Sequence, residues 1–407
     1  MAEQKTLKSA IVGTGTIFER HRQAYVDSGV EVFGIADIDL SRAQTAASKN
    51  NISLAVSDWK ELVARSDIDI IDICTPPKFH AEIAIAALDA GKHVICEKPL
   101  APNLAGCDEI VEAAQRSTGL LTVCHQFRGT VEAQRLKWLM DVGHLGKACL
   151  ARVRRYDAPP MNLVRQNRWG NWIDDGGGVL MTKAIHQLDL LIWLFGPVRR
   201  VQAMMGTFVC SIESEDHLVA NLEFENGALA SVSLSGCPHI FLGEMEIVGD
   251  QGMAGMPWNL QLKVNNAVGS LARELNRRFP FTKEKAFDKL LKAAESMGGE
   301  RVGRLAYKVA RRLPVVKSHV TDRSASNKHS HSPLIGQFIK AIEGQAEIPV
   351  TAIEARSAVE LCMAIYISAL TSESVKLPLE NKSKFYGGID PNEISECEHA
   401  SSSIANS

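Results

Sequence analysis

The chain has 407 residues, of which 45% are hydrophobic and 23% are charged, and its formal net charge is −2. This length suggests two domains, with enough apolar residues to build a core in each. The near-neutral charge provides no general attraction to nucleic acid or to an acidic membrane surface, so we expect neither as a partner.

The first eight residues are polar and lack the apolar core of a secretory signal. We find no run of about 18 apolar residues that could span a bilayer. The nine cysteines are scattered and form no CxxC pair, which favours reduced core thiols over disulfides or a metal site. We therefore expect a cytoplasmic protein without a bound metal.

The chain begins with a strand, a glycine turn, a helix and a second strand. The first strand covers 8–12 and leads into Gly13-Thr14-Gly15-Thr16-Ile17. A helix over 19–28 and a strand over 32–36 follow, and the second strand ends at Asp37. This order matches the dinucleotide-binding fingerprint in context as well as in spelling.

Each residue type in this fingerprint has a chemical reason. Gly13 permits the tight turn, and Gly15 lets the backbone approach a pyrophosphate at the positive end of the helix. Asp37 would accept hydrogen bonds from the ribose hydroxyls and repel a 2′-phosphate, so the sequence predicts NAD rather than NADP. Phe18 replaces the third glycine, where close helix–strand packing usually requires a small residue.

Helices and strands continue to alternate up to residue 124, which indicates a parallel sheet with helices on both faces. Thr75, Pro76 and Lys98 follow strands and would therefore lie on the same rim of the sheet as Gly13. The expected elements are helices over 40–50, 58–66, 80–90 and 105–115, with Asp39 or Ser41 and then Ser57 near the starts of the first two, and strands over 70–74, 92–96 and 120–124.

The second half has a different pattern. A helix over 130–141 and a strand over 148–156 precede a series of strands between 199 and 250. Asn226-Gly227 separates two alternating runs, which predicts a hairpin with a type I′ turn. We expect an α+β domain with a largely antiparallel sheet, which leaves one face free for a partner subunit or a substrate.

A dense polar segment precedes these strands. After Gly176-Gly177-Gly178, the residues Thr182, His186 and Asp189 recur at i, i+4 and i+7 and would share one helix face. A histidine between polar partners can act as a general base near neutral pH, although a single histidine is more often structural. Trp169 and Trp172 could pack on a sugar ring or belong to the core.

Together these segments resemble the glucose–fructose oxidoreductase, inositol dehydrogenase and rhizopine catabolism (Gfo/Idh/MocA) family of NAD(P)-dependent oxidoreductases. The resemblance covers roughly residues 6–265 and 330–378. The residues that carry it are Cys74-Thr75-Pro76-Pro77 with His80, Ala90-Gly91-Lys92-His93-Val94, Glu97-Lys98-Pro99-Leu100, the triple glycine with His186 and Asp189, and Glu354-Ala355-Arg356.

The resemblance implies that Lys98 holds a substrate hydroxyl near the nicotinamide and that His186 accepts its proton, with Thr182 in the position that orients the histidine. Many members have an acidic or amide side chain at the Thr182 position, and Lys183 beside it is also unusual. The expected cofactor-binding residues are Gly13, Gly15, Thr16, Ile17, Asp37, Thr75, Pro76, His80, Glu97 and Lys98. The expected substrate-binding residues are Lys98, Arg128, Arg168, Trp169, Trp172, Lys183 and His186.

The implied architecture is α/β, with a Rossmann doubly wound parallel sheet over 1–125 and a substrate and oligomerisation domain over 126–379. Residues 271–330 hold fifteen Lys or Arg against six Asp or Glu, so we expect a basic helical insertion over about 266–330. It would be a solvated arm, or a site for a phosphate-bearing substrate or an acidic partner. Residues 380–407 are expected to form a disordered tail.

The leading functional hypothesis is an NAD-dependent dehydrogenase that oxidises a secondary hydroxyl of a sugar, sugar derivative or cyclitol, in a homo-oligomer (dimer or tetramer) formed through the second sheet. One alternative is a redox-elimination glycosidase that recycles its NAD. The other is a non-catalytic protein that senses NAD and sugar, which Thr182 and Phe18 would permit. The sequence does not name the sugar.

Overall fold

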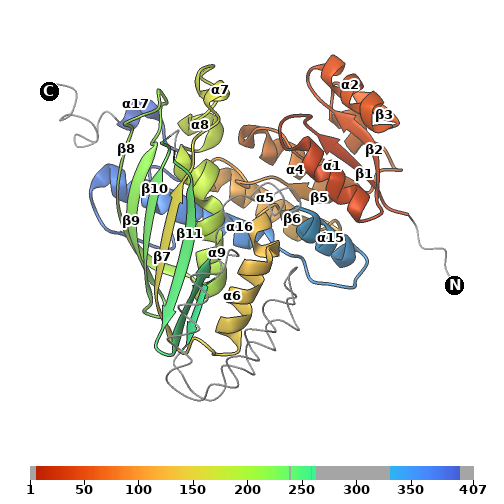
Figure 1. Ribbon diagram of the computed structural model, residues 1–407. Helices are drawn as coiled ribbons and strands as arrows, with labels where there is room; N and C mark the ends of the chain where they lie inside the picture. Colours follow the sequence, from red (N-terminus) through yellow and green to blue (C-terminus); the bar gives the residue numbers. More distant parts are fainter. Residues whose placement is uncertain (1–5, 238–239, 258, 263–330, 395–407) are drawn as a thin grey trace.

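The computed structural model describes residues 6–394 except 238–239, 258 and 263–330. Two sheets with their helices lie side by side and share one continuous hydrophobic core (Figure 1). The predicted basic insertion over 266–330 lies outside the described residues. The eight cysteines among the described residues are all free thiols.

The first sheet is entirely parallel, with strand order β3-β2-β1-β4-β5-β6. This is the doubly wound order of a dinucleotide-binding fold, in which ligands bind beyond the carboxyl ends of the strands where the order reverses, here between β1 and β4. The prediction of a Rossmann sheet is therefore confirmed. Its strands are β1 (Lys8–Val12), β2 (Glu31–Ala36), β3 (Leu54–Val56), β4 (Ile70–Ile73), β5 (His93–Cys96) and β6 (Leu121–Val123).

Helices cover this sheet, and two of them begin at side-chain caps. Asp39 accepts hydrogen bonds from the backbone of Ser41 and Arg42, as expected for an N-cap, and Asn103 caps α5 in the same way. The helices are α1 (Phe18–Asp27), α2 (Leu40–Asn50), α3 (Lys60–Val63), α4 (His80–Asp89) and α5 (Leu104–Arg116), with short 3-10 turns η1 (Pro77–Phe79) and η2 (Gln126–Gly129).

One local prediction in this half was wrong, and one strand was missed. The helix expected over 58–66 is only the four residues of α3. Ser57 was expected near its start, but the side chain that accepts a hydrogen bond from the first turn, from the Lys60 amide, is that of Asp58. Strand β3 was not anticipated, because three residues are too few to show an alternating pattern.

The second sheet is mixed and largely antiparallel, as predicted, with strand order β13-β12-β11-β7-β10-β9-β8-β14. The pair β7 and β10 is parallel, and the other neighbours are antiparallel. The strands are β7 (Ala148–Tyr156), β8 (Val198–Gly206), β9 (His217–Phe224), β10 (Leu229–Ser235), β11 (Leu242–Gly249), β12 (Gly252–Met256), β13 (Asn259–Leu262) and β14 (Val375–Lys376).

The hairpin between β9 and β10 forms where it was predicted, but its turn differs. Of the two turn residues, only Gly227 has a positive φ, at 84°, whereas a type I′ turn requires a positive φ at both central positions. The Phe224 amide bonds the Ala228 carbonyl and the Gly227 amide bonds the Phe224 carbonyl. The loop therefore has three residues and a left-handed glycine at its end.

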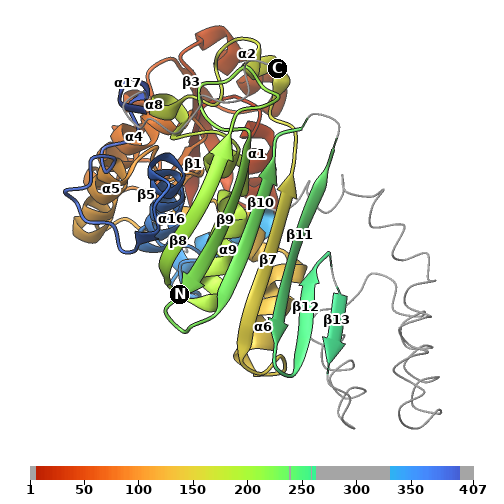
Figure 2. The same cartoon turned by 90° about the vertical axis from the view of Figure 1, so that its left-hand side faces the viewer.

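Helices cover one face of the second sheet. Side chains along β9 and β10 alternate between buried and exposed, and α9 (Ile185–Phe195) and α16 (Ala352–Thr371) pack on the buried side. Figure 2 shows the opposite face, where no described helix covers the strands. Short helices α6 (Val131–Asp141), α7 (Met161–Val164) and α8 (Trp172–Asp175) complete this half.

One helical stretch, Trp172–Phe195, is long and apolar enough to span a membrane by length and composition, although polar residues such as Lys183, His186 and Asp189 interrupt its apolar ones. Its apolar window is 78% buried inside the protein. It therefore has the environment of a core helix.

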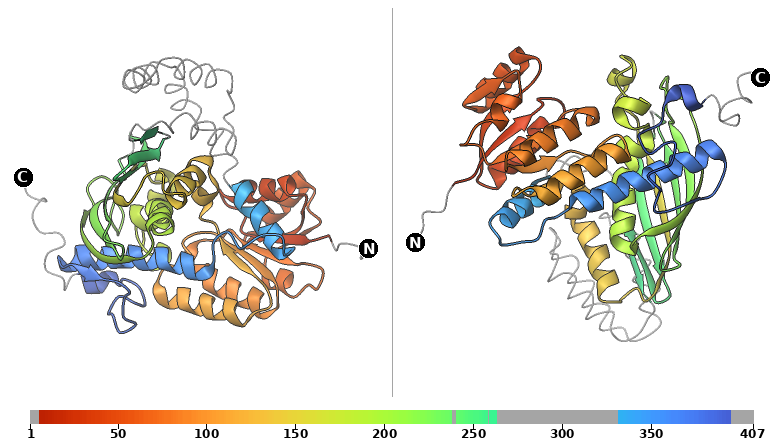
Figure 3. Two further views of the ribbon diagram at one scale, coloured as in Figure 1. Left: turned by 90° about the horizontal axis from the view of Figure 1, so that it is seen from below. Right: turned by 180° about the vertical axis from the view of Figure 1, so that it is seen from behind.

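After residue 330 the chain returns to the first sheet. Helix α15 (His331–Ile342) packs on α1, and the Val350 carbonyl accepts hydrogen bonds from the backbone of Val123 and the hydroxyl of Thr122. Helix α16 then runs along α5 toward the second sheet (Figure 3). Thr351 and Glu354 form a capping box at its start.

The sequence predicted a disordered tail from residue 380, but the structure shows order beyond that point. Phe385 and Ile389 are buried, and the Tyr386 hydroxyl donates to Asp108 on α5. These contacts hold residues 380–394 against the first domain, up to the short helix α17 (Pro391–Ile394). The remainder, 395–407, lies outside the described residues.

Candidate active site

The glycine turn after β1 is packed directly against the end of β4. Gly13 has φ +102°, and a Cβ atom built there would lie 2.7 Å from the Cys74 carbonyl oxygen. Gly15 has open space around it, and Thr16 beside it is exposed. The turn therefore presents bare backbone at the start of α1, which is the cradle that a pyrophosphate requires. Phe18 is buried as the first residue of α1.

Asp37 is held at the end of β2 by its neighbours. One carboxylate oxygen accepts from the amide and the hydroxyl of Thr14, at 2.9 and 2.5 Å, and the other accepts from the Asp39 amide at 3.1 Å. Burial alone would raise the pKa of Asp37, but these hydrogen bonds outweigh it and hold the pKa below its usual value. The exposed Arg42 lies 3.3 Å away. A charged carboxylate thus lies at the position that accepts hydrogen bonds from the ribose hydroxyls of a bound dinucleotide.

Two further predicted cofactor residues follow β4. Thr75 has a buried hydroxyl with no hydrogen-bond partner among the described residues, and a bound nucleotide would supply one. His80 is buried, and its two ring nitrogens lie 2.8 Å from the Pro99 carbonyl and 2.9 Å from the Thr75 carbonyl. His80 therefore ties two strand ends together. The glycine cradle, Asp37 and the orphaned Thr75 hydroxyl fit NAD, whose hydride chemistry this rim would serve.

Lys98 leaves the end of β5 and reaches across to the second domain. The Lys98–Pro99 peptide bond is cis, and the half-buried ammonium donates to the Thr182 carbonyl at 2.6 Å. Burial lowers the pKa of Lys98 to about 8. The Glu97 carboxylate opposes this shift, while the cations of Lys183 and Arg155 reinforce it.

His186 lies on α9 facing the same region. Its buried ring stacks on Phe127, with centroids 4.7 Å apart, and meets His125 edge-on at 5.8 Å. Burial and the nearby charge of Lys98 hold the pKa of His186 well below its ordinary value, so the ring is neutral at physiological pH. Its buried Nδ1 has no hydrogen-bond partner among the described residues. A neutral imidazole beside a lysine is a suitable proton acceptor.

The segment before His186 is not a regular α-helix. Residues Leu180–Ala184 form a π-helical turn, η3, so the spacing that placed Thr182, His186 and Asp189 on one face does not apply. The Thr182 hydroxyl donates to the Gly178 carbonyl at 2.7 Å instead of holding the imidazole. Packing on Phe127 orients His186 in its place.

Asp189 is committed to a buried ion pair. Both of its oxygens accept from Arg128, at 2.7 and 2.9 Å, and the same guanidinium donates to Glu354 at 2.6 Å. With two carboxylates bound, Arg128 links η2, α9 and α16, which leaves its predicted role in substrate binding untested. Bidentate pairs of this kind fix geometry as well as charge.

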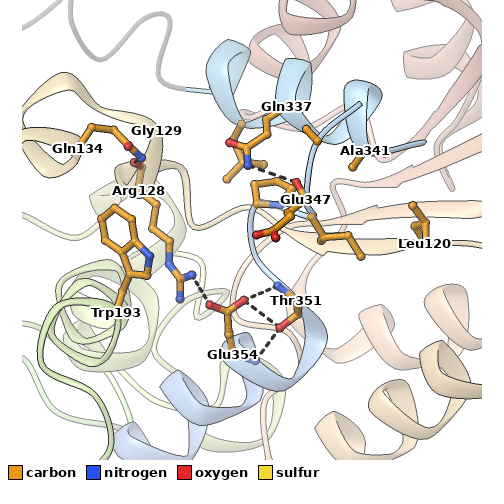
Figure 4. Close-up of a pocket in the computed structure, with 14 residues that line it drawn as sticks. Leu120, Arg128, Gly129, Gln134, Trp193, Gln337, Ala341, Glu347, Thr351 and Glu354 are labelled. Carbon is orange, nitrogen blue, oxygen red and sulfur yellow. Dashed lines mark hydrogen bonds and ion pairs between the residues drawn. The ribbon is translucent and has the colours of Figure 1, made fainter. Parts of the chain in front are cut away.

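Arg128 and Glu354 line a pocket of about 670 Å³ between α15, η2 and α9, together with Trp193, Gln337 and Thr351 (Figure 4). Neither Lys98 nor His186 is among its lining residues. The pocket is therefore separate from the candidate reaction centre.

The other predicted substrate residues differ in their surroundings. Arg168 is exposed, whereas Trp169 and Trp172 are buried. Trp172 meets Tyr366 edge-on, with centroids 4.9 Å apart. The tryptophans thus have the environment of core residues, the alternative that the sequence also left open.

Lys183 belongs to a charged cluster that the sequence did not reveal. Its ammonium lies 3.9 Å from Asp157, whose carboxylate also accepts from Arg155 at 2.5 Å. Arg155 is near the end of the central strand β7 and Asp157 directly follows it, close enough for the Arg155 charge to lower the pKa of Lys98. No motif marks them, because they meet Lys98 only through the tertiary fold.

A second unforeseen cluster lies beneath Lys98. The buried ring of His21 bonds Asp72 through Nδ1 and Glu97 through Nε2, each at 2.9 Å, and Glu97 also accepts from His331 at 3.3 Å. Burial favours a neutral His21, but the Asp72 carboxylate raises its pKa well above the ordinary value. Glu97 is therefore part of a buried charge network rather than a free cofactor ligand.

The ligand atoms of His21, Glu97 and His331 lie within 4.8 Å of one another, as a metal site would require. Each of them already has a hydrogen-bond partner in the network. The hydrogen bonds account for the cluster without an ion.

A nucleotide-binding parallel sheet, joined to an open mixed sheet with a lysine and a histidine between them, defines a two-domain NAD-dependent oxidoreductase. Residues 7–125 match the oxidoreductase family with an NAD-binding Rossmann fold, and residues 133–255 match the GFO/IDH/MocA C-terminal domain. The chain belongs to the Gfo/Idh/MocA family of oxidoreductases.

Individual relatives agree with this assignment. Inositol 2-dehydrogenase of Salmonella typhimurium is 28% identical over 65% of this chain and 77% of its own. The 1-carboxy-3-chloro-3,4-dihydroxycyclohexa-1,5-diene dehydrogenase of Comamonas testosteroni is 30% identical over 57% of this chain and 59% of its own. Among solved structures, the WlbA dehydrogenase of Chromobacterium violaceum with NADH and UDP-GlcNAcA has a TM-score of 0.72 and 26% identity, covering 93% of this chain and 98% of that one.

Proposed function

We propose that the protein oxidises a secondary hydroxyl of a sugar, sugar derivative or cyclitol to a ketone with NAD. The observation that carries this proposal is that the Lys98 ammonium bonds the Thr182 carbonyl on the turn that leads directly into the buried His186. Burial and the Lys98 charge lower the pKa of His186 and keep it neutral. The relatives support the substrate class, since they include inositol 2-dehydrogenase and a cyclic dihydroxy-acid dehydrogenase.

The two side chains have complementary tasks. The Lys98 ammonium donates a hydrogen bond to the substrate hydroxyl and stabilises negative charge as it develops on that oxygen. His186 accepts the hydroxyl proton on a ring nitrogen. When bound, NAD would supply the hydride acceptor at the same carbon, so the alcohol loses one hydride and one proton, which together carry two electrons and two protons.

The test is NAD reduction by purified protein across monosaccharides, cyclitols, anhydrosugars and uronates. We expect Lys98→Met and His186→Asn to reduce kcat/KM by about 10²–10⁴-fold while NAD still binds. Lys382→Met and His144→Asn change an exposed lysine and a half-exposed histidine and should retain activity. Full turnover by the first pair would contradict the mechanism.

Product analysis separates the proposal from its alternatives. A dehydrogenase accumulates one NADH for each ketone, whereas a redox-elimination glycosidase shows bond cleavage without net NADH. A sensor protein would bind NAD tightly and reduce none of it with any polyol.

We also propose that the protein is a homo-oligomer formed through the uncovered face of the second sheet, and that it is cytoplasmic, as its free thiols suggest. Met204, Val219, Leu229 and Leu150 are exposed on this face and lie on four adjacent strands, β8, β9, β10 and β7. Small polar residues, Ser231 and Ser233, lie between them. The face also carries ion pairs, Arg154 with Glu244 and Arg200 with Glu223. A level surface with this mixture of apolar and charged side chains suits contact with a second copy.

A further inference from the structure

Three cationic side chains converge at the candidate active site around a single carboxylate. Lys98 arrives from the first domain and bonds the Thr182 carbonyl, which immediately precedes Lys183. Lys183 lies 3.9 Å from Asp157, at the outer limit of an ion pair, and Arg155 donates to that same oxygen at 2.5 Å. Asp157 therefore compensates one of the three positive charges.

These cations are largely withdrawn from water. The side chains of Arg155, Asp157 and Lys183 are 14%, 19% and 27% exposed. The Arg155 Nε is buried and has no hydrogen-bond partner among the described residues, although the Phe241 ring lies 5.3 Å from its guanidinium carbon. A buried donor without a partner, in a group that carries full charge, is costly unless a ligand satisfies it.

The behaviour of the two lysines agrees with this geometry. Burial lowers the pKa of Lys183, which Asp157 opposes and Arg155 reinforces. The charges of Lys183 and Arg155 both lower the pKa of Lys98. Arg155 thus acts on both lysines as a positive charge, although Asp157 opposes its effect on Lys183 and Glu97 opposes it on Lys98, and a further anion would stabilise all three cations.

Other charges in the region do not supply that anion. Glu97 raises the pKa of Lys98, but its carboxylate is already bonded to His21 and His331. Asp189 is occupied by Arg128. His186 is neutral and adds no charge of either sign.

We infer that Lys183 and Arg155, next to Lys98, form a subsite for an anionic substituent of the substrate, a carboxylate or a phosphate ester on the ring or carbon chain that is oxidised. This inference rests on the proposed function, because it places the substrate hydroxyl at Lys98. Arg155 presents a planar fork suited to either group. Lys183 contributes a point charge from the π-helical turn.

The test measures how tightly matched ligand pairs bind to the complex of enzyme and NADH. Quenching of NADH fluorescence reports the binding. The carboxylate arm compares D-glucuronate with D-glucose, D-galacturonate with D-galactose, and quinate with myo-inositol. The phosphate arm compares D-glucose 6-phosphate with D-glucose. We expect the anionic member of at least one pair to bind tenfold or more tightly, and the arm in which this occurs identifies the anion.

Lys183→Gln and Arg155→Gln should remove that preference while the affinity for NADH stays unchanged. Arg116→Gln, which removes an exposed guanidinium on α5, is the matched control and should keep the preference. If Arg155→Gln fails to fold, Asp157→Asn provides a second test, because removal of the competing carboxylate should increase the preference for the anion.

Equal binding of the anionic and neutral members in every pair would overturn the inference, as would a preference that survives both glutamine variants. Turnover distinguishes this failure from failure of the proposed function. Neutral sugars oxidised as well as their acids would leave the dehydrogenase standing without the subsite. An acid that binds through Lys183 and Arg155 but is never oxidised would leave the subsite without the dehydrogenase.

Discussion

Lys98 and His186 are useful in opposite protonation states, since the lysine donates as an ammonium and the histidine accepts as a neutral ring. The pKa of Lys98 is lowered to about 8, whereas that of His186 lies well below its ordinary value. Across physiological pH the histidine is therefore already competent. The upper limit of activity is then set by loss of the lysine proton.

We predict that kcat/KM for NAD reduction is level from about pH 6.5 to 7.5 and falls as pH rises through about 8. Lys98→Arg, which keeps its charge at all these values, should shift or remove that fall even if its activity is lower. Initial rates between pH 6 and about 9.5 measure the profile. A loss of activity below about pH 6.5 instead would mean that His186 titrates with an ordinary pKa.

The His21 network gives a prediction about stability. The pKa of His21 is raised in the folded protein. Its contribution to the free energy of unfolding is therefore fully present below the ordinary histidine pKa of about 6.5, and it is lost as the pH rises through the higher pKa of the folded state. Burial would raise the pKa of Glu97, but the hydrogen bonds from His21 and His331 outweigh it and hold this pKa well below its ordinary value. Its contribution is present above pH 4.5 and is lost as pH falls through the folded value.

We therefore expect His21→Gln at pH 7 to reduce the free energy of unfolding by about 3–5 kcal/mol, because Asp72 and Glu97 lose a buried cation between them. Arg116→Gln breaks the half-exposed pair with Asp89 and should cost about 1 kcal/mol or less. Denaturant titration measures both. Similar losses in the two variants would show that His21 is not charged in the folded protein.

Among individual residues, the sequence predicted those whose place is set by their spacing from a strand. Gly13, Asp37 and Lys98 each follow a strand in a fixed order, so their place on one rim followed from topology. Arg155, Asp157, His21 and His331 were missed because they come from separate elements and no spacing connects them. The role of Thr182 was read from an α-helical period that the π-turn interrupts.

The element that decides the geometry of the site is the segment from the triple glycine to α9. The carboxylate of Glu215 accepts from the amides of Gly178 and Leu180, at 3.0 and 2.7 Å, and burial raises its pKa to about 7. The Gly178 carbonyl in turn accepts from both the amide and the hydroxyl of Thr182. Gly178 thus anchors the turn that carries Lys183 and leads to His186.

A Cβ at Gly178 would lie 1.9 Å from the Glu215 carbonyl oxygen. We predict that Gly178→Ala costs about 1–3 kcal/mol of stability through overpacking and reduces kcat/KM by about 10²-fold through misplacement of His186. Gly387→Ala, where nothing lies within 4 Å of the added atom, is the control. Thermal unfolding and steady-state kinetics check the two effects, and a Gly178→Ala enzyme with normal kinetics would contradict this role.

Elements with a strong periodic pattern were predicted closely, including β1, α2 and the β9–β10 hairpin. The details that failed depend on backbone dihedrals rather than on pattern. The π-turn and the three-residue hairpin loop each differ from the expected form by one inserted or displaced residue, which residue types alone do not specify.

At the scale of the whole molecule, the order of segments along the sequence does not show where the C-terminal part of the chain packs. Residues after 330 follow the second sheet in sequence, yet α15 packs on α1, and the Ser332 hydroxyl donates to Asp27 there at 2.7 Å. Arg356 on α16 bonds Asp108 on α5 at 2.5 Å. The late helices thus connect both halves, so motion between the two domains would have to disturb these bonds.

The uncovered sheet face should control assembly. Five strands of seven to nine residues, spaced about 4.8 Å apart and rising about 3.4 Å per residue, give a face of roughly 24 by 27 Å. This is comparable to the roughly 800 Å² per partner that a stable interface buries. We predict that the wild-type protein is an oligomer in solution.

A double variant, Val219→Glu with Leu229→Glu, introduces charge on β9 and β10 where the two residues are exposed and should yield a folded monomer. Two unpaired carboxylates would be desolvated in each copy of the interface, which costs several kcal/mol. Val26→Glu, on an exposed position of α1, is the control and should leave the mass unchanged. Light scattering after gel filtration measures the mass, and circular dichroism confirms folding. A monomeric wild type, or an oligomer that survives the double substitution, would place the contact elsewhere.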